Sequence, residues 1–152
     1  MGQGSIIGYE INEKTCQISF YNEEQLEPET MEADADNYQI PLMIGKLRDT
    51  WAYGKEAKRL ATVKEGFAVT RLLERSLAGE KIEFAEETYD AVWLLSKFVQ
   101  MSLHAFPQID GIVFSVPELT EELAQLLRGI AVRMGIDKQH IFIQDYKESF
   151  CN

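Results

Sequence analysis

The sequence predicts an α/β protein with a mixed β-sheet and flanking helices, and three observations support this expectation. Residues 5–21 have the pattern of a β-hairpin, because an apolar stretch, the polar residues 12–14 and an alternating stretch follow one another. Residues 112–116 form a continuous apolar run, which is typical of a strand buried on both faces. A helical segment then leads to a second apolar run at 141–143, and this order indicates a right-handed parallel crossover.

An acidic stretch follows the hairpin at residues 23–36. We expect an exposed loop there, because the stretch contains Pro28 and no sustained apolar period. Asp34 and Asp36 alternate as in a calcium-binding loop, but the glycine bend and the closing glutamate of such a loop are absent. The charges therefore favour solvation over a metal site.

Short strands and helices are expected to alternate through the middle of the chain. The longest periodic segment, at 86–106, has apolar residues every three or four positions, as on one face of a helix. A helix at 67–77 is expected to end at Gly79, since glycine readily takes the left-handed conformation that closes a helix. The other expected elements are a strand at 38–47, a turn at 48–50, a strand at 51–53, a helix at 55–60 and a strand at 81–84.

The last third of the chain has local signals for the ends of its elements. Residues 110–111 are expected to turn the chain into the strand at 112–116. Thr120 and Gly135 are expected to bound the next helix as its N-cap and its left-handed stop. A further helix is expected to open at 145–150. Three antiparallel strands followed by a parallel crossover give an α/β layer of ribonuclease-H-like type.

Length and composition limit the possible functions. The 152 residues suit a single domain, and a net charge of −10 disfavours non-specific binding to nucleic acid or to anionic membranes. No apolar run approaches the roughly 18 residues of a membrane span, and the N-terminus lacks the features of a signal peptide. Cys16 and Cys151 stand far apart, so no zinc site is expected and a reducing compartment is favoured. We therefore expect a cytoplasmic protein without a metal centre.

Four stretches of the sequence also stand in an informative order. Residues 7–14 form the first hairpin, and residues 40–42 and 51–59 contain a strand followed by Gly-Lys-Glu-Ala-Lys. Residues 110–117 read Asp-Gly-Ile-Val-Phe-Ser-Val-Pro, and residues 140–147 supply a later strand. Together they resemble the first lobe of the actin and seventy-kilodalton heat-shock chaperone ATPase superfamily. The resemblance covers most of the chain and implies one domain, 1–152, that forms the N-terminal part of a larger protein.

The resemblance implies a nucleotide site at the turn of the first hairpin, at Glu10, Asn12, Glu13, Lys14 and Thr15. In the family, glycine and hydroxyl residues let backbone amides approach the terminal phosphates of ATP, and a preceding aspartate positions magnesium. Here Asn12 replaces the glycine, and Glu13 and Lys14 replace the hydroxyl residues. Glu10 replaces the aspartate. A carboxylate about 4 Å from a phosphate charge costs about 1 kcal/mol in water and about 4 kcal/mol near a protein surface. Lys14 offsets part of this cost, but the site is degenerate.

Two functional hypotheses follow. In the first, the chain is a non-catalytic actin-like or chaperone-like scaffold or protein-interaction module, with no catalytic residues and no cofactor. In the second, it is the first lobe of a working magnesium-dependent ATPase or sugar-kinase-type phosphotransferase, completed by a second lobe and using ATP and magnesium. Glu10 then positions magnesium and Lys14 contacts phosphate. The first hypothesis is preferred, because one lobe cannot surround a phosphoryl group with groups from two sides.

A ribonuclease-H-like nuclease is a third hypothesis, which the sequence disfavours. Two-metal chemistry needs several carboxylates near one point, but residues 112–116 offer none and Glu118 and Asp145 are only loosely placed. The expected partner is instead another protein, a second lobe or a second copy of this chain. Four aromatic residues are candidates for an exposed patch, although such residues belong more often to the core: Trp51, Tyr53, Trp93 and Phe98.

Overall fold

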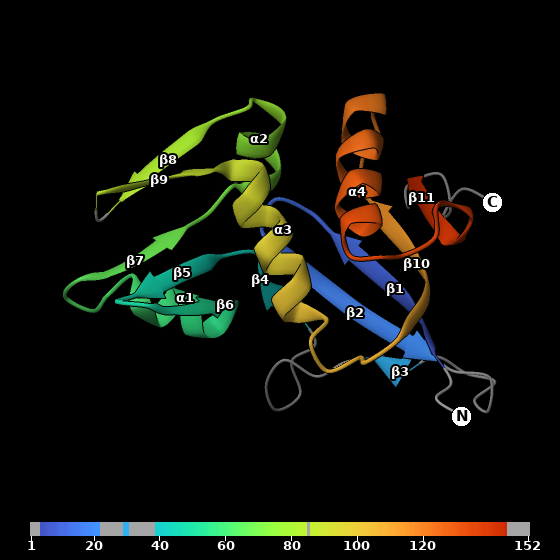
Figure 1. The fold of residues 1–152 in the computed structure, drawn as a ribbon, viewed down its shortest axis with the longest axis horizontal. Coiled ribbons are helices and arrows are strands. Elements are labelled where there is room, and N and C mark those ends of the chain that lie inside the picture. The colour runs from blue at the N-terminus through green and yellow to red at the C-terminus, as the bar shows by residue number, and fades with distance from the viewer. Residues whose placement is uncertain (1–3, 22–28, 31–38, 85, 146–152) are drawn as a thin grey trace. The chain divides into compact units, whose positions relative to one another are not determined.

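A computed structural model of the chain describes residues 4–21, 29–30, 39–84 and 86–145. Contacts between residues divide the chain into two compact units (Figure 1). In sequence, the second unit is mostly an insertion within the first, and it also includes the turn of the first hairpin. The first unit consists of Met1–Asn12, Cys16–Gln39 and His104–Asn152, and the second consists of Glu13–Thr15 and Ile40–Leu103.

The first unit is built on a mixed β-sheet, whose strands are β1 (Ser5–Ile11), β2 (Thr15–Tyr21), β3 (Glu29–Thr30), β10 (Ile109–Val116) and β11 (Ile141–Asp145). They lie in the order β11-β10-β1-β2-β3 (Figure 1). Strands β1, β2 and β3 pair antiparallel, whereas β1, β10 and β11 run parallel. The predicted α/β class, mixed sheet, antiparallel N-terminal strands and parallel crossover are thus confirmed.

Alternate residues of these strands form the core of the first unit. On β1, Ile7, Tyr9 and Ile11 are fully buried. Their neighbours Ile112 and Phe114 on β10 are register partners of Ile7 and Tyr9, so their side chains share a face. The rings of Tyr9 and Phe114 meet edge to face, with 5.6 Å between their centroids. Burial of each such side chain contributes about 1.5–3 kcal/mol, so this register is strongly favoured.

Helix α4 (Glu121–Arg133) connects β10 to β11 and packs against β11. Its N-cap Thr120 accepts a hydrogen bond from the backbone N–H of Leu123 at 3.2 Å. Beyond its end, Gly135 has a φ of 93°, which glycine adopts without steric cost. The predicted start and stop of this helix are therefore confirmed. A short 3-10 helix, η1 (Lys138–His140), leads into β11.

The second unit alternates short strands with helices. Its elements are β4 (Ile40–Pro41), β5 (Ile44–Leu47), β6 (Thr50–Tyr53), α1 (Lys55–Leu60), β7 (Gly66–Val69), α2 (Leu72–Leu77), β8 (Lys81–Phe84), β9 (Glu87–Asp90) and α3 (Ala91–Ser102). Strands β6, β5 and β7 form an antiparallel sheet in that order, and β8 pairs with β9. The predicted helix at 55–60 and the predicted strand at 81–84 are confirmed with the same bounds.

The sheet β6-β5-β7 packs against α1 on one face and against α3 on the other. Gly45 of β5 faces α1, and a Cβ atom at this position would lie 3.4 Å from the Cα atom of Ala57 and 2.6 Å from the carbonyl oxygen of Phe67. Glycine therefore permits the close approach of the helix. On the opposite face, the ring of Tyr53 meets that of Phe98 on α3 edge to face, with centroids 5.7 Å apart.

Two helix predictions were wrong over their first residues. The helix predicted at 67–77 begins only at Leu72, because the residues before it form β7. The helix predicted at 86–106 begins at Ala91, after β9, and ends at Ser102. The short apolar spacings in both segments are compatible with a strand as well as with a helix. These residues form strands because β7 pairs with β5 and β9 pairs with β8.

Two further boundaries in the second half of the chain differ from the prediction. Residues 110–111 lie inside β10 instead of forming a turn, because β10 extends to pair Gly111 with Ile6 of β1. Asp145 belongs to β11, and residues 146–150 of the helix predicted at 145–150 lie outside the described residues. The carboxylate of Asp145 accepts a hydrogen bond from the backbone N–H of Leu119 at 3.1 Å, which ties the end of β11 to the approach to α4.

The region between the hairpin and β5 also differs in part. Of the loop predicted at 23–36, the structure describes residues 29–30, which pair with β2 as a short strand. The strand predicted at 38–47 is divided into β4 and β5, with residues 42–43 between them. The apolar alternation is nevertheless confirmed, since three residues of this region are buried: Ile40, Leu42 and Ile44.

Candidate functional site

The residues of the predicted nucleotide site are shared between the two units. Glu10 and Asn12 belong to the first unit, whereas Glu13–Thr15 belong to the second. Glu10 is exposed near the carboxyl end of β1, where its register partners are Gln17 of β2 and Ser115 of β10. Among the residues that the structure describes, no group of three or more His, Cys, Asp or Glu side chains is arranged to hold a metal ion.

The turn of the hairpin is bonded to neighbouring elements of the second unit. The carboxylate of Glu13 accepts a hydrogen bond from the backbone N–H of Glu74, in the first turn of α2. The carbonyl oxygen of Lys14 accepts a hydrogen bond from the backbone N–H of Leu42 at 2.9 Å. Partial burial and the nearby carboxylate of Glu74 raise the pKa of Glu13, and the hydrogen bond and the charge of Arg71 oppose this shift only in part.

Helix α2 receives from Glu13 an acceptor that it lacks at its own start. The first backbone N–H groups of a helix have no partner within the helix, and the N–H of Glu74 is one of these groups in α2. The N-cap residue of α2, Arg71, is left-handed with a φ of 57° and makes no side-chain capping hydrogen bond. Glu13 therefore takes the part of an N-cap from a distant position in the sequence.

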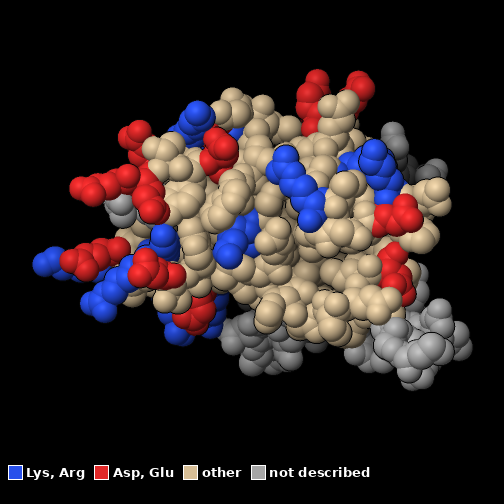
Figure 2. Space-filling model, viewed as in Figure 1, with Lys and Arg blue, Asp and Glu red and all other residues tan. Residues whose placement is uncertain are grey.

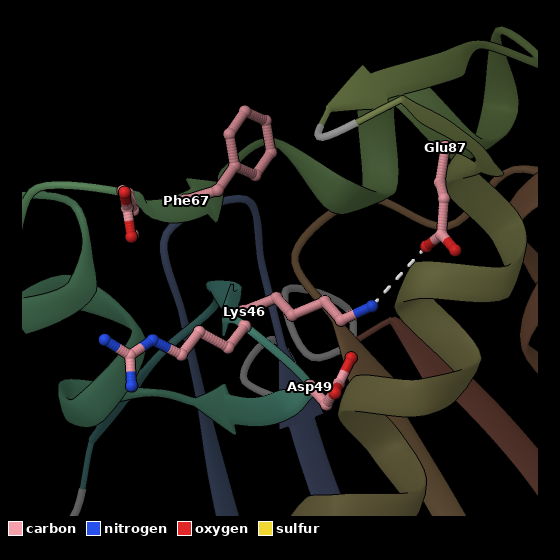
Figure 3. Close-up of a pocket in the computed structure, with 7 residues that line it drawn as sticks. Lys46, Asp49, Phe67 and Glu87 are labelled. Atoms are coloured by element: carbon pink, nitrogen blue, oxygen red, sulfur yellow. Dashed lines mark hydrogen bonds and ion pairs between the residues drawn. The ribbon is translucent and has the colours of Figure 1, made fainter.

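A second candidate site is an open groove in the second unit (Figure 3). The groove has a volume of about 570 Å³ and lies beside the β5–β6 turn, the start of β7 and the start of β9. Charges of both signs and one aromatic ring line it, on the side chains of Lys46, Arg48, Asp49, Glu65, Phe67 and Glu87.

Lys46 extends across the groove toward Glu87 (Figure 3). Its Nζ atom donates a hydrogen bond to the hydroxyl oxygen of Tyr89 at 3.0 Å and lies 3.5 Å from the carboxylate of Glu87. The hydroxyl of Tyr89 in turn donates to the same carboxylate. The hydrogen bond with Tyr89 is the main reason that the pKa of Lys46 is raised and that of Glu87 is lowered. Both side chains are therefore held in their charged forms.

Three aromatic rings stand beside this ion pair and form what we call the aromatic triad: Trp51 of β6, Tyr89 of β9 and Trp93 of α3. The ring centroids of Trp51 lie 5.3 Å from Tyr89 and 5.4 Å from Trp93, and those of Tyr89 and Trp93 lie 5.4 Å apart. The Nζ atom of Lys46 is 5.1 Å from the Trp51 centroid and 5.6 Å from the Tyr89 centroid, within the range of a cation–π interaction. Trp93 is 44% exposed.

The surface around these residues carries charges of both signs. On the face drawn in Figure 2, Lys and Arg side chains and Asp and Glu side chains of the described residues are scattered among uncharged residues. None of the described helices has the length and apolar character needed to cross a membrane. The charges of the groove thus stand beside the aromatic triad, in which Trp93 is exposed and Trp51 and Tyr89 are half-buried.

Residues 27–152 match the profile described as "Family of unknown function (DUF5716) C-terminal". The chain belongs to this family. No curated protein matches the chain. The segment that matches the DUF5716 profile contains the whole groove, the aromatic triad and α2, whereas residues 10–15 of the hairpin precede it.

In this member of the DUF5716 family, the sequence predicts the hairpin but not the groove. The sequence offers Trp51 and Trp93 as candidates for an exposed patch, but it predicts Tyr89 in a helix and no site at Lys46. One signal was present: Lys46 shares a face of β5 with the buried Ile44, at a position where the strand pattern expects an apolar residue. A lysine there indicates a charge that its neighbours must accommodate.

Proposed function

We propose that the chain is a non-catalytic protein-interaction module built on the first lobe of an actin-like or chaperone-like ATPase. The strand order β3-β2-β1-β10-β11 supports this fold assignment, because three antiparallel strands are followed by two that run parallel to the first. Helix α4 connects the last two strands, as expected for a ribonuclease-H-like layer.

The hydrogen bond between Glu13 and α2 is the observation that carries the non-catalytic part of the proposal. A phosphate-binding turn needs backbone amides that an anion can approach. In this turn the Glu13 carboxylate is held at the start of α2 by the N–H of Glu74. The backbone carbonyl of Lys14 is bonded to Leu42. The turn is thus occupied in supporting the second unit.

The charge of Glu13 also opposes phosphate. At about 4 Å, its repulsion of one phosphate charge amounts to about 4 kcal/mol at the effective dielectric constant near a protein surface. A triphosphate carries more than one such charge, so the single ammonium group of Lys14 does not neutralise the site. The expected consequence is that the chain has no measurable affinity for ATP.

Isothermal titration of the full chain with ATP and magnesium tests the proposal. We expect no binding heat from the wild type or from Glu13→Gln, because the turn remains bonded to α2 in both proteins. Binding with a micromolar dissociation constant would contradict the non-catalytic proposal. A titration with magnesium alone controls for binding of the cation to the acidic surface.

The second candidate function is the first lobe of a working magnesium-dependent ATPase or sugar-kinase-type phosphotransferase. The exposure of Glu10 near the carboxyl end of β1 favours it, because ligands of open α/β sheets bind beyond the carboxyl ends of parallel strands. Magnesium requires oxygen ligands and keeps several waters, so Glu10 suits a water-mediated contact. In a longer protein with a second lobe, Glu10→Gln should then abolish magnesium-dependent ATP binding, whereas Glu118→Gln should not.

The partner of the interaction module is proposed to be another protein, a second lobe or a second copy of this chain. Light scattering over a range of concentrations separates the last possibility from the other two. Self-association predicts a mass that rises with concentration, and a constant monomer mass at high concentration contradicts it.

A further inference from the structure

The groove continues the inner face of the sheet β6-β5-β7 beyond the part buried with α3. On this face the register partners Ile44, Tyr53 and Val69 make one row across the sheet, and Ile44 and Val69 are buried. The next row contains Lys46 with its partners Trp51 and Phe67, all three only half-buried. An aromatic surface therefore extends out of the core of the second unit into the groove.

The groove already accommodates one cation over aromatic rings. The ammonium group of Lys46 lies 5.1 Å from the centroid of Trp51 and has acceptors in both Tyr89 and Glu87. Its hydrogen-bonding capacity and the charge of Glu87 are thus largely used within the chain. Trp93, the third ring of the aromatic triad, remains 44% exposed.

The remaining charges of the groove favour a positively charged ligand. After the pair of Lys46 and Glu87, the lining consists of the carboxylates of Asp49 and Glu65 and the guanidinium group of Arg48. No ion pair joins these three side chains to another of the residues that the structure describes. The excess is one negative charge, on a chain with a net charge of −10. Both the local and the overall charge therefore attract a basic partner.

Arginine fits this combination better than lysine does. Its guanidinium group is planar and weakly hydrated, stacks on aromatic faces and binds carboxylates through two parallel hydrogen bonds. The groove offers the ring of Phe67 and the carboxylates of Asp49 and Glu65, and Trp93 of the neighbouring aromatic triad is 44% exposed. Its volume of about 570 Å³ lies within the usual range for ligand pockets.

We propose that this groove binds an arginine side chain presented by a partner protein. The inference rests on the proposed interaction-module function and names its binding surface and the chemistry of its partner. Arg48 is the one unpaired cation among the described residues that line the groove, and it opposes such a ligand. Removing its charge should therefore strengthen binding, whereas removing the charges of Asp49 and Glu65 should weaken it.

The two tryptophans of the protein allow a direct test, because Trp51 and Trp93 both belong to the aromatic triad. The probe is the capped peptide Gly-Gly-Arg-Gly-Gly, added to the ¹⁵N-labelled full chain while the two indole N–H signals are followed by NMR. Peptides with lysine or citrulline at the centre are the comparisons. We expect saturable shifts of the indole signals with the arginine peptide, weaker shifts with lysine and none with citrulline.

Variants connect the shifts to the groove. Asp49→Asn combined with Glu65→Gln should weaken binding about fivefold or more, and Arg48→Gln should strengthen it about twofold to threefold, as for ion pairs at a surface. Glu118→Gln removes an exposed carboxylate from the first unit and should leave the affinity unchanged. The dispersion of the amide spectrum shows whether each variant is folded. Equal binding by the double variant and the wild type overturns the proposal.

Other outcomes also decide the matter. Unchanged indole signals at about 10 mM arginine peptide, tenfold above a dissociation constant of about 1 mM, overturn the inference, as does equal binding of the lysine or the citrulline peptide. If the indole signals shift when the protein concentration alone is raised, the groove binds a second copy of this chain, and this result also overturns the inference. ATP with magnesium is titrated in parallel. Binding of ATP contradicts the proposed function, whereas the absence of binding by both ATP and the arginine peptide contradicts only the arginine site.

Discussion

Replacement of Glu13 by alanine removes the side-chain acceptor from the start of α2, and we expect it to destabilise the second unit. The hydrogen bond from the N–H of Glu74 is lost, and the N-cap residue Arg71 offers no replacement. Loss of an N-cap acceptor costs about 1 kcal/mol. For a chain of this size, the expected fall is about 2–4 °C in Tm. The urea concentration at the midpoint of unfolding should fall by about 0.5 M, if the free energy of unfolding decreases by about 2 kcal/mol per M of urea.

Glu13→Gln separates the hydrogen bond from the charge. Glutamine keeps an oxygen that can accept from Glu74 but removes a carboxylate whose pKa is raised in the folded protein. A group with a raised folded-state pKa stabilises the folded state below its unfolded-state pKa, here 4.5, and this contribution is lost as the pH rises through the folded-state pKa. At pH 7 the glutamine variant should therefore be at least as stable as the wild type, and below pH 4.5 the two should converge.

Tryptophan fluorescence during urea unfolding is the assay, because Trp51 and Trp93 both lie in the second unit and report on it directly. Glu118→Ala is the matched control, since it removes an exposed carboxylate from the first unit. The reasoning is refuted if Glu13→Ala and the wild type unfold at the same urea concentration at pH 7. It is also refuted if Glu118→Ala causes a fall of the same size.

The remaining predictions concern burial and charge. Phe98→Ala should cost about 3–5 kcal/mol in urea unfolding and Trp93→Ala much less, because Phe98 is fully buried whereas Trp93 is 44% exposed; equal costs would contradict this packing. Burial raises the pKa of the Cys16 thiol to about 12. In a Cys151→Ser variant, a thiol reagent at pH 8 should therefore label Cys16 only after unfolding. Rapid labelling of the native protein would count against the burial of Cys16. Lys46→Met should raise the pKa of Glu87, measured by NMR titration of its carboxyl carbon, because the ammonium charge helps to lower that pKa. With Lys46 present, the stabilisation from Glu87 holds above pH 4.5 and is lost as the pH falls through its lowered pKa, and an unchanged pKa in the variant would contradict the ion pair.

The elements that the sequence predicted correctly are those with local signals at their ends. Helix α4 begins after its N-cap residue Thr120 and ends before Gly135, and these single residues supply the capping hydrogen bond and the left-handed φ. The hairpin of β1 and β2 likewise follows from a polar turn between two apolar patterns. Such signals act within a few residues, so they remain readable without knowledge of the tertiary structure.

The strands β7 and β9 were missed because their state depends on a partner. Phe67 and Tyr89 fit a helical period, but pairing with Lys46 and Ile82 places them in sheets. The contact of Glu13 with Glu74 and the groove around Lys46 have the same character, since each joins segments that are distant in sequence. No periodicity encodes such contacts, and the one signal was the lysine at position 46, where the strand pattern expects an apolar residue.

The parallel pairing of β1 with β10 has a consequence for the order of folding. Ser5 pairs with Ile109, so β1 and β2 leave the ribosome about 100 residues before the strand that covers the edge of β1, a delay of about 5–20 s at usual rates of synthesis. All residues of the second unit precede β10 in the chain, so this unit can fold while that edge is still open. During the delay the nascent hairpin exposes Ile7 and Tyr9 beside unpaired backbone groups, which makes it a site for aggregation or for a chaperone to bind.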